Sequence, residues 1–194
     1  LTIDNTLGDF TLPINYDGGA GVNTLTAPNL DNVWNITADN EGDITGVGTF
    51  VNTQNLIGNA GIDTFNFGDN VGVSGTVAGL GGVNTLDYSQ FTAGNAVTVD
   101  LADSSVTNLN GGNPNGFSSI QNLIGGADMD TLIGADAANT WEITATDGGE
   151  INSTFTFASM ETLTGGSNKD VFDFGLGFAI SGQLDGAGGS NTLV

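Results

Sequence analysis

Apolar residues alternate with small or polar residues in short stretches along the whole chain, as at 64–67, 96–101 and 171–174. An alternation with a period of two is typical of β-strands, because successive side chains of a strand point to opposite faces of its sheet. Clusters of Gly, Asn and Asp, which favour turns, separate these stretches. No stretch has the periodicity and caps of an amphipathic helix, so the pattern predicts an all-β protein of short strands.

The strand pattern is duplicated within the chain. Residues 34–86 align with residues 141–193 without a gap, at a constant offset of 107 positions, and 22 of the 53 aligned residues are identical. Gapless repetition is expected when coils stack on one another, since an insertion would break the packing register. We predict one repeat domain over 1–194, with a duplication at 34–87 and 141–194 and related modules at 12–33 and 88–140.

A nine-residue spacing appears at two places, from Leu25 to Trp34 and from Leu132 to Trp141. We expect such residues to stack on successive turns of the chain. Short strands with stacked Thr, Asn and apolar residues are typical of a parallel β-helix or a β-roll. The predicted fold class is therefore an all-β parallel β-helix or β-roll-like solenoid.

Acidic residues far outnumber basic residues, and this net charge excludes some classes of partner. The chain carries 22 acidic residues and one basic residue, Lys169, for a net charge of −21. Nucleic acids and anionic lipid head groups are bound by Lys and Arg, so we expect no nucleic-acid partner. No apolar run is long enough to cross a bilayer, so we also expect no direct membrane insertion.

Three segments resemble the haemolysin-type calcium-binding nonapeptide GGxGxDxUx, in which U is a large apolar residue. They are GNAGIDTFN at 58–66, GGADMDTLI at 125–133 and GGSNKDVFD at 165–173. The wider arrangement is similar to segments of giant secreted bacterial repeat proteins and adhesins. This resemblance implies a right-handed coil, an extracellular or cell-surface location, and calcium held between consecutive nonapeptide turns.

Four aspartates are the candidate metal ligands that the resemblance implies: Asp63, Asp130, Asp136 and Asp170. Calcium requires six to eight oxygen ligands, and Asn139 stands where the second motif of the best pair would have an Asp. Asp and Asn side chains also commonly hydrogen-bond the backbone of turns. We favour this structural role and keep calcium as the alternative.

The aromatic residues also have two interpretations. Trp34 and Trp141 occupy equivalent positions of the duplication and either fill the interior or offer a platform for stacking sugars. Four phenylalanines lie two positions apart in pairs and are assigned to the core: Phe65, Phe67, Phe172 and Phe174.

The sequence favours a non-catalytic role. Without His, Cys or Arg, it offers no imidazole base, no catalytic triad and no arginine to neutralise a uronate. We predict a structural or adhesive segment of a large secreted surface protein, rigidified by calcium if the four aspartates bind it, with neighbouring repeats or copies of itself as partners. The alternatives are a filament or surface-layer subunit that stacks head to tail, and a carbohydrate-binding module that recognises cell-surface glycans.

Overall fold

The protein is described by a computed structural model that covers residues 1–4 and 13–194. Residues 5–12 of the predicted domain, including the first residue of the 12–33 module, lie outside the described residues. The described chain is all-β with three mainly parallel sheets, which confirms the all-β part of the predicted fold class. Its one helical element is a single 3₁₀ turn, η1 (Asn110–Gly112).

The largest sheet of the described residues has 12 strands, drawn from residues 14 to 193, and we call it the long sheet. Its strands, in spatial order, are β1 (Ile14–Asp17), β5 (Gly48–Val51), β4 (Glu41–Ile44), β3 (Asn32–Ala38), β7 (Asp63–Phe67), β9 (Thr85–Asp87), β13 (Asn122–Ile124), β17 (Phe155–Ala158), β16 (Gly148–Ile151), β15 (Asn139–Ala145), β19 (Asp170–Phe174) and β21 (Thr192–Leu193).

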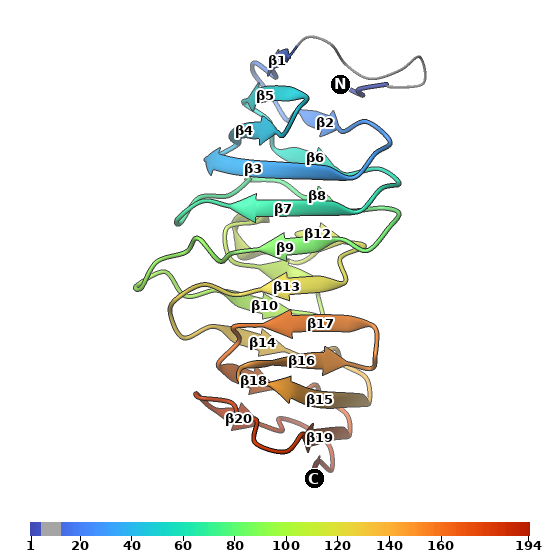
Figure 1. Cartoon of the computed structure of the whole chain (residues 1–194), viewed down its shortest axis with the longest axis vertical. Helices are drawn as coiled ribbons and strands as arrows, with labels where there is room; N and C mark the ends of the chain where they lie inside the picture. The colour runs from blue at the N-terminus through green and yellow to red at the C-terminus, as the bar shows by residue number, and fades with distance from the viewer. Residues whose placement is uncertain (5–12) are drawn as a thin grey trace.

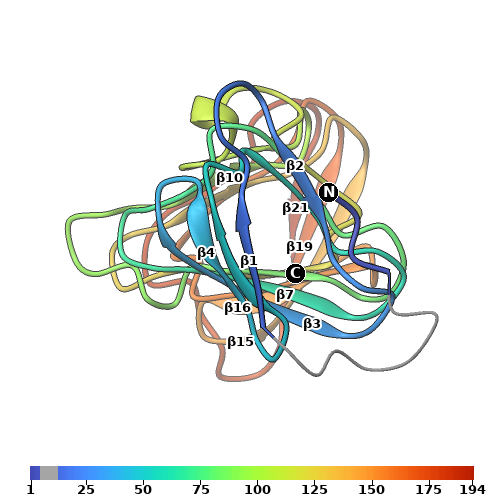
Figure 2. The ribbon, with the colours of Figure 1, turned by 90° about the horizontal axis from the view of Figure 1, so that it is seen from above.

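Two shorter sheets accompany the long sheet. The sheet of five strands consists of β11 (Ser105–Val106), β10 (Thr98–Asp100), β14 (Thr131–Ile133), β18 (Thr162–Thr164) and β20 (Leu184–Asp185). The sheet of four strands consists of β12 (Phe117–Ser118), β8 (Val77–Ala78), β6 (Asn55–Ile57) and β2 (Thr24–Thr26). The strands lie one above another along the long axis of the molecule (Figure 1), and the view along this axis shows them arranged around a common interior (Figure 2).

The nine-residue spacing has a different meaning from the one we predicted. Leu25 lies on β2 and pairs with Leu56, whereas Trp34 lies on β3 and pairs with Phe65. Nine residues therefore separate two sheets that the chain visits in succession, and the expectation of stacking on successive turns is wrong. The reason is that one nonapeptide contains a short strand and the bend that leads into the next sheet, which is too little chain to return to the first sheet.

Two antiparallel insertions interrupt the parallel order of the long sheet. The chain reverses direction twice through β3, β4 and β5, and again through the equivalent strands β15, β16 and β17. The register agrees between the two copies, since Trp34 pairs with Ile44 and Trp141 with Ile151. The sequence pattern does not predict these reversals, because alternation of apolar and polar residues is the same for both strand directions.

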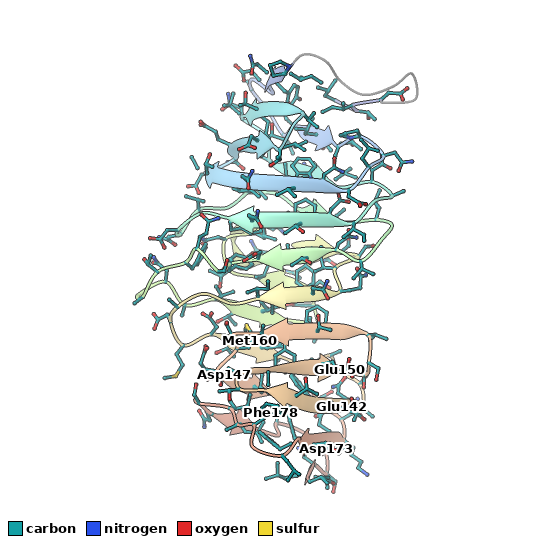
Figure 3. All side chains as sticks on the ribbon, viewed as in Figure 1. Glu142, Asp147, Glu150, Met160, Asp173 and Phe178 are labelled. Atoms are coloured by element: carbon teal, nitrogen blue, oxygen red, sulfur yellow. The ribbon has the colours of Figure 1, made fainter. Side chains whose placement is uncertain are left out.

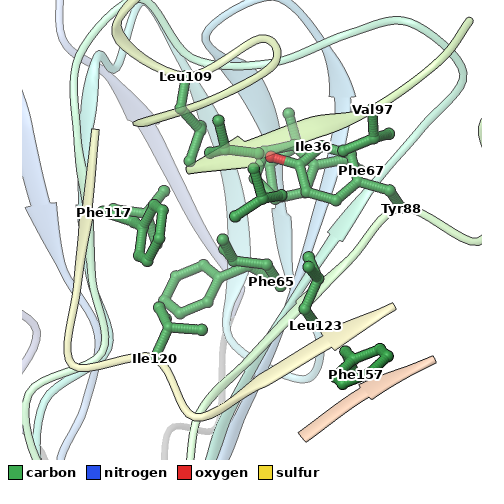
Figure 4. Packing of buried hydrophobic residues seen from close by; sticks show 14 of the residues in the cluster. Ile36, Phe65, Phe67, Tyr88, Val97, Leu109, Phe117, Ile120, Leu123 and Phe157 are labelled. Atoms are coloured by element: carbon green, nitrogen blue, oxygen red, sulfur yellow. The ribbon is translucent and has the colours of Figure 1, made fainter. Parts of the chain in front are cut away.

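The core consists of the inward-facing residues of all three sheets. Along β7 the side chains alternate between buried and half-buried, as a period of two requires. Phe65, Leu86, Leu123 and Phe157 form one column of in-register core residues, and Figure 4 shows part of this packing. Phe65, Phe67 and Phe172 are buried, as predicted, while Phe174 is half-buried against the same cluster. Full burial of one such side chain contributes about 1.5–3 kcal/mol.

Candidate functional site

Asn and Asp side chains at the starts of strands form hydrogen-bonded columns along the long axis, which we call the polar ladder. The backbone N–H of Asn32 donates to Oδ1 of Asp63 at 3.1 Å, and Nδ2 of Asn32 donates to the same oxygen at 2.7 Å. The backbone N–H of Asp63 donates in turn to Oδ1 of Asn84 at 2.9 Å. The same contacts recur in the second copy between Asn139, Asp170 and Asn191.

Two of the predicted aspartates use both carboxylate oxygens in the ladder. Oδ1 of Asp130 accepts the backbone N–H of Val97 at 2.6 Å, and its Oδ2 accepts that of Gly126. Asp170 accepts from Asn139 through Oδ1 and from the backbone N–H of Gly166 through Oδ2, at 3.0 Å. Burial raises the pKa of Asp130 above its ordinary value. These carboxylates hydrogen-bond the turn backbone, which is the structural role that the sequence analysis favoured.

Asp63 differs from its two counterparts. It is fully buried, and its Oδ2 has no hydrogen-bond partner. Position 59, which corresponds to Gly166 of the second copy, is an Asn with φ of 89°, and its N–H does not reach the carboxylate. Burial raises the pKa of Asp63 to about 6. Because an unpaired buried oxygen loses its hydration without compensation, ionised Asp63 destabilises the fold.

Asp136, the fourth predicted ligand, lies apart from the ladder. It is exposed on a loop, and its Oδ1 accepts the backbone N–H of Ser167 at 3.0 Å. Together with Asp100 it lines an open hollow of about 380 Å³. Asp136 therefore shares no hydrogen-bond partner with Asp130 in the structure.

The four aspartates do not fit a shared calcium site. In the described part of the chain, no group of three or more His, Cys, Asp or Glu residues is placed to hold a metal ion. Calcium takes six to eight oxygen ligands, and both oxygens of Asp130 and Asp170 already face N–H donors. Binding would require these hydrogen bonds to break. Calcium binding by this chain stays a prediction, and it is tested below.

The tryptophans belong to the interior. Trp34 and Trp141 are both 0% exposed, so neither indole face can stack on a sugar, and the platform considered from the sequence is wrong. Each packs against two phenylalanines in the same way: Trp34 is stacked on Phe65 at a centroid distance of 5.5 Å, and Trp141 on Phe172 at 5.3 Å. Neither indole N–H has a hydrogen-bond partner.

A row of carboxylates on the long sheet was not foreseen from the sequence. Glu142 pairs in register with Glu150 on one side and with Asp173 on the other, and Figure 3 labels these three side chains. The hydrogen bond between the Glu142 and Glu150 side chains and their mutual repulsion raise the pKa of Glu142, with a further contribution from Asp173. No sequence signal places these three residues in a row, because they are neighbours only through the strand register.

The same row in the first copy, which we call the amide row, has amides at two of its three positions. Asn35 occupies the position of Glu142, and its Nδ2 donates to Oδ1 of Asp43 at 3.0 Å. Nδ2 of Asn66 donates to Oδ1 of Asn35 at 3.1 Å. The first copy therefore links this row by hydrogen bonds, whereas the second copy places like charges side by side.

The remaining findings concern the chain as a whole. Among the residues that the structure describes, no helix combines the length and the apolar character that crossing a membrane requires. The candidate sites of this chain are the polar ladder, the carboxylate row and the exposed surfaces of the two copies. Comparisons with models of protein families, with curated proteins and with solved structures find no match for this chain.

Proposed function

We propose that this chain is a right-handed parallel β-helix that acts as a stiff, non-catalytic structural or adhesive segment of a large secreted surface protein. The observation that carries the proposal is the long sheet, whose 12 strands continue in hydrogen-bonded order from β1 to β21. A continuous sheet resists bending because every bend must distort many backbone hydrogen bonds at once.

The spacing of stacked residues supports a β-helix over a β-roll. Successive ladder residues are separated by 31, 21 and 37 positions, and each interval includes strands of two or three sheets. A β-roll built from paired nonapeptides would repeat after about 18 residues. Right-handedness is favoured because crossover connections between parallel strands of one sheet are right-handed in nearly all proteins.

The surface and composition support an extracellular structural role. A net charge of −21 keeps a rod soluble and separated from anionic surfaces. The absence of His, Cys and Arg from the sequence removes the side chains that most often perform catalysis. The cell-surface location and the adhesive role follow from the resemblance to secreted repeat proteins.

The stiffness is tested by small-angle X-ray scattering at about 0.01 M and 1 M salt, a range over which the Debye length falls from about 30 Å to about 3 Å. A β-helix is expected to keep the same maximum dimension, because its length is set by strand stacking. A flexible polyanion would contract markedly at high salt. Contraction of the folded chain would overturn the proposal.

Head-to-tail stacking is a second candidate, favoured by the position of β1 and β21 at opposite ends of the same sheet. In the described part of the chain, β1 pairs with β5 alone and β21 with β19 alone. Free strand edges are sites at which further strands add. Sedimentation velocity over a wide concentration range tests this candidate: growing polymers would support it, and a monomer at every concentration would exclude it.

A further inference from the structure

Four exposed apolar side chains gather on the stacked loops that lead into β3, β7 and β9. We call this surface the apolar corner and define it as Leu30, Ile62, Leu80 and Val83. Their side chains are 43%, 53%, 53% and 51% exposed, respectively. Figure 1 shows the three loops, 27–31, 58–62 and 79–84, lying one above another on the same side of the molecule.

The three loops that carry these four residues are in direct contact. The backbone N–H of Ile62 donates to Oδ1 of Asp31 at 2.8 Å, and the backbone N–H of Gly81 donates to the carbonyl of Asn59 at 2.9 Å. A Cβ added at Gly61 would stand 2.0 Å from the carbonyl oxygen of Leu30. Glycine therefore allows the loops to approach to the spacing of strands.

The fold does not require apolar residues at these positions. The second copy shows this. At the offset of 107 positions, the residues that correspond to the apolar corner are Ala137, Lys169, Ala187 and Ser190. These four counterparts are also exposed. Leu80 and Ala187 both have a positive φ, as do Gly82 and Gly189, so the loops before β9 and β21 share their backbone conformation. The same turns thus fold with small or charged side chains in the second copy.

Leu80 adds an independent observation. Its φ is +64°, in the left-handed region, where Gly, Asn and Asp are favoured and a bulky aliphatic residue is unusual. The side chain gains little from burial, because more than half of it is exposed. A strained, exposed Leu contributes little to folding, so its apolar side chain is better explained by contact with another molecule.

The charge of the molecule limits what this other molecule can be. Asp31 is exposed within the corner, and the chain carries 22 acidic residues against one basic residue. A second copy would bring the same net charge of −21 and would be repelled. The complementary partner carries apolar side chains surrounded by Lys or Arg.

The spacing of the loops suggests the shape of the partner. Loops stacked at strand spacing recur about every 4.8 Å along the axis, and an α-helix advances about 5.4 Å per turn. Apolar side chains one helical turn apart can therefore meet successive loops. We propose that the apolar corner binds a basic amphipathic helix that lies along the long axis of the rod.

The test uses fluorescein-labelled synthetic peptides and fluorescence anisotropy at about 0.15 M salt. The probe is a Leu–Lys peptide with Leu at helical spacing. The first control peptide has the same composition with Leu at every second position, and the other contains Lys as its only charged residue and no Leu. The protein variant carries Leu30→Ala, Ile62→Ser, Leu80→Ala and Val83→Ser, which imitates the second copy without changing the charge.

The matched control variant carries Met129→Ser and Leu176→Ser, two exposed apolar residues outside the corner. We expect the fourfold variant to bind the helical peptide at least tenfold more weakly than the native chain, and the control variant to bind it unchanged. The peptide without Leu should bind all three proteins equally. Circular dichroism melts of each variant verify that the fold is kept.

Three results would overturn the proposal. Equal binding of the helical peptide by all proteins would mean that charge alone attracts it. Tighter binding of the alternating peptide would mean that the partner is a strand. Self-association of the native chain at high salt that the fourfold variant loses would identify a second copy as the occupant.

Discussion

The two copies of the duplication share a backbone and differ in what they place on it. Both stack a Trp on a Phe, both reverse direction twice within the long sheet, and both carry the polar ladder. The first copy has an apolar corner, an amide row and an unpaired buried oxygen on Asp63. The second has small and charged residues at the corresponding corner, a carboxylate row, and an Asp170 with hydrogen bonds to both carboxylate oxygens.

This comparison separates what the fold needs from what it tolerates. The residues kept between the copies are glycines at close approaches, core aromatics and the ladder positions. Many of the residues that differ lie on exposed loops and on the outer face of the sheet, although some buried positions differ too, such as Thr53, which corresponds to Met160. The second copy thus serves as an internal control for each position of the first. Features of one copy can be exchanged or removed while the other copy stays constant.

The largest effect is expected from the core column. Phe65→Ala should lower the free energy of unfolding by about 3–5 kcal/mol, because the side chain is fully buried between Trp34 and Leu86. Phe172→Ala should cost about 1 kcal/mol less, since its neighbour Leu193 is mostly exposed and the site can relax. Urea denaturation of both variants measures the difference. Equal losses would mean that the two columns are packed alike.

Asp63→Asn and Asp170→Asn should change the stability of the protein in opposite directions at pH 8. The pKa of Asp63 is about 6 in the folded chain against an ordinary 3.8, so its favourable contribution is complete below pH 4 and is lost as the pH rises through 6. Asp63→Asn should therefore stabilise the protein at pH 8, on the order of 1–3 kcal/mol, and should give no gain at pH 4.

Asp170→Asn should destabilise the protein at both pH values, by about 1–3 kcal/mol. Both oxygens of Asp170 accept N–H donors, so an amide nitrogen would face a donor in either orientation. Thermal melts of the two variants at pH 4 and pH 8 measure these effects. Stabilisation by Asp170→Asn, or a pH-independent effect of Asp63→Asn, would contradict the assignment of the unpaired oxygen.

The carboxylate row should give a smaller effect. Glu142→Asn copies Asn35 and replaces a carboxylate between Glu150 and Asp173 by an amide that can donate. The melting temperature should rise by no more than about 3 °C at pH 8 and low salt. Because Glu142 has a raised pKa, its repulsion is lost as the pH falls, and the gain should disappear in acid. A gain that persists in 1 M salt would indicate a cause other than charge.

The smallest effect is expected from calcium. Melting temperatures in EDTA and in millimolar calcium should agree once the general effect of a divalent cation is subtracted with magnesium. The reason is that the oxygens of Asp130 and Asp170 are occupied by N–H donors. A calcium-specific rise in melting temperature would show instead that the aspartates exchange these donors for metal.

The sequence was sufficient for the features that depend on local pattern. Alternation predicted the strand at 64–67 and the burial of Phe65, because the faces of a strand follow directly from its period. The duplication placed Trp34 and Trp141 at equivalent layers of the interior.

Features that depend on register could not be predicted in this way. The nine-residue spacing suggested stacking, but the true partners of Leu25 and Trp34 lie 31 positions away. The unpaired oxygen of Asp63 arises from the conformation of residue 59, which no sequence motif encodes. The row of Glu142 and Asp173 exists because two strands happen to align, so it emerges only from the tertiary structure.

The polar ladder also gives the molecule a direction along its long axis. In the three successive contacts that begin at Asn32, the backbone N–H belongs to the residue earlier in the chain and the accepting side chain to the later one: Asn32 to Asp63, Asp63 to Asn84, and Asn84 to the side-chain amide of Gln121. The two ends of the molecule therefore present different groups of the ladder, acceptors at one end and backbone donors at the other. A two-fold axis through either end would set donors against donors or acceptors against acceptors, so end-to-end contact through these groups must be heterologous.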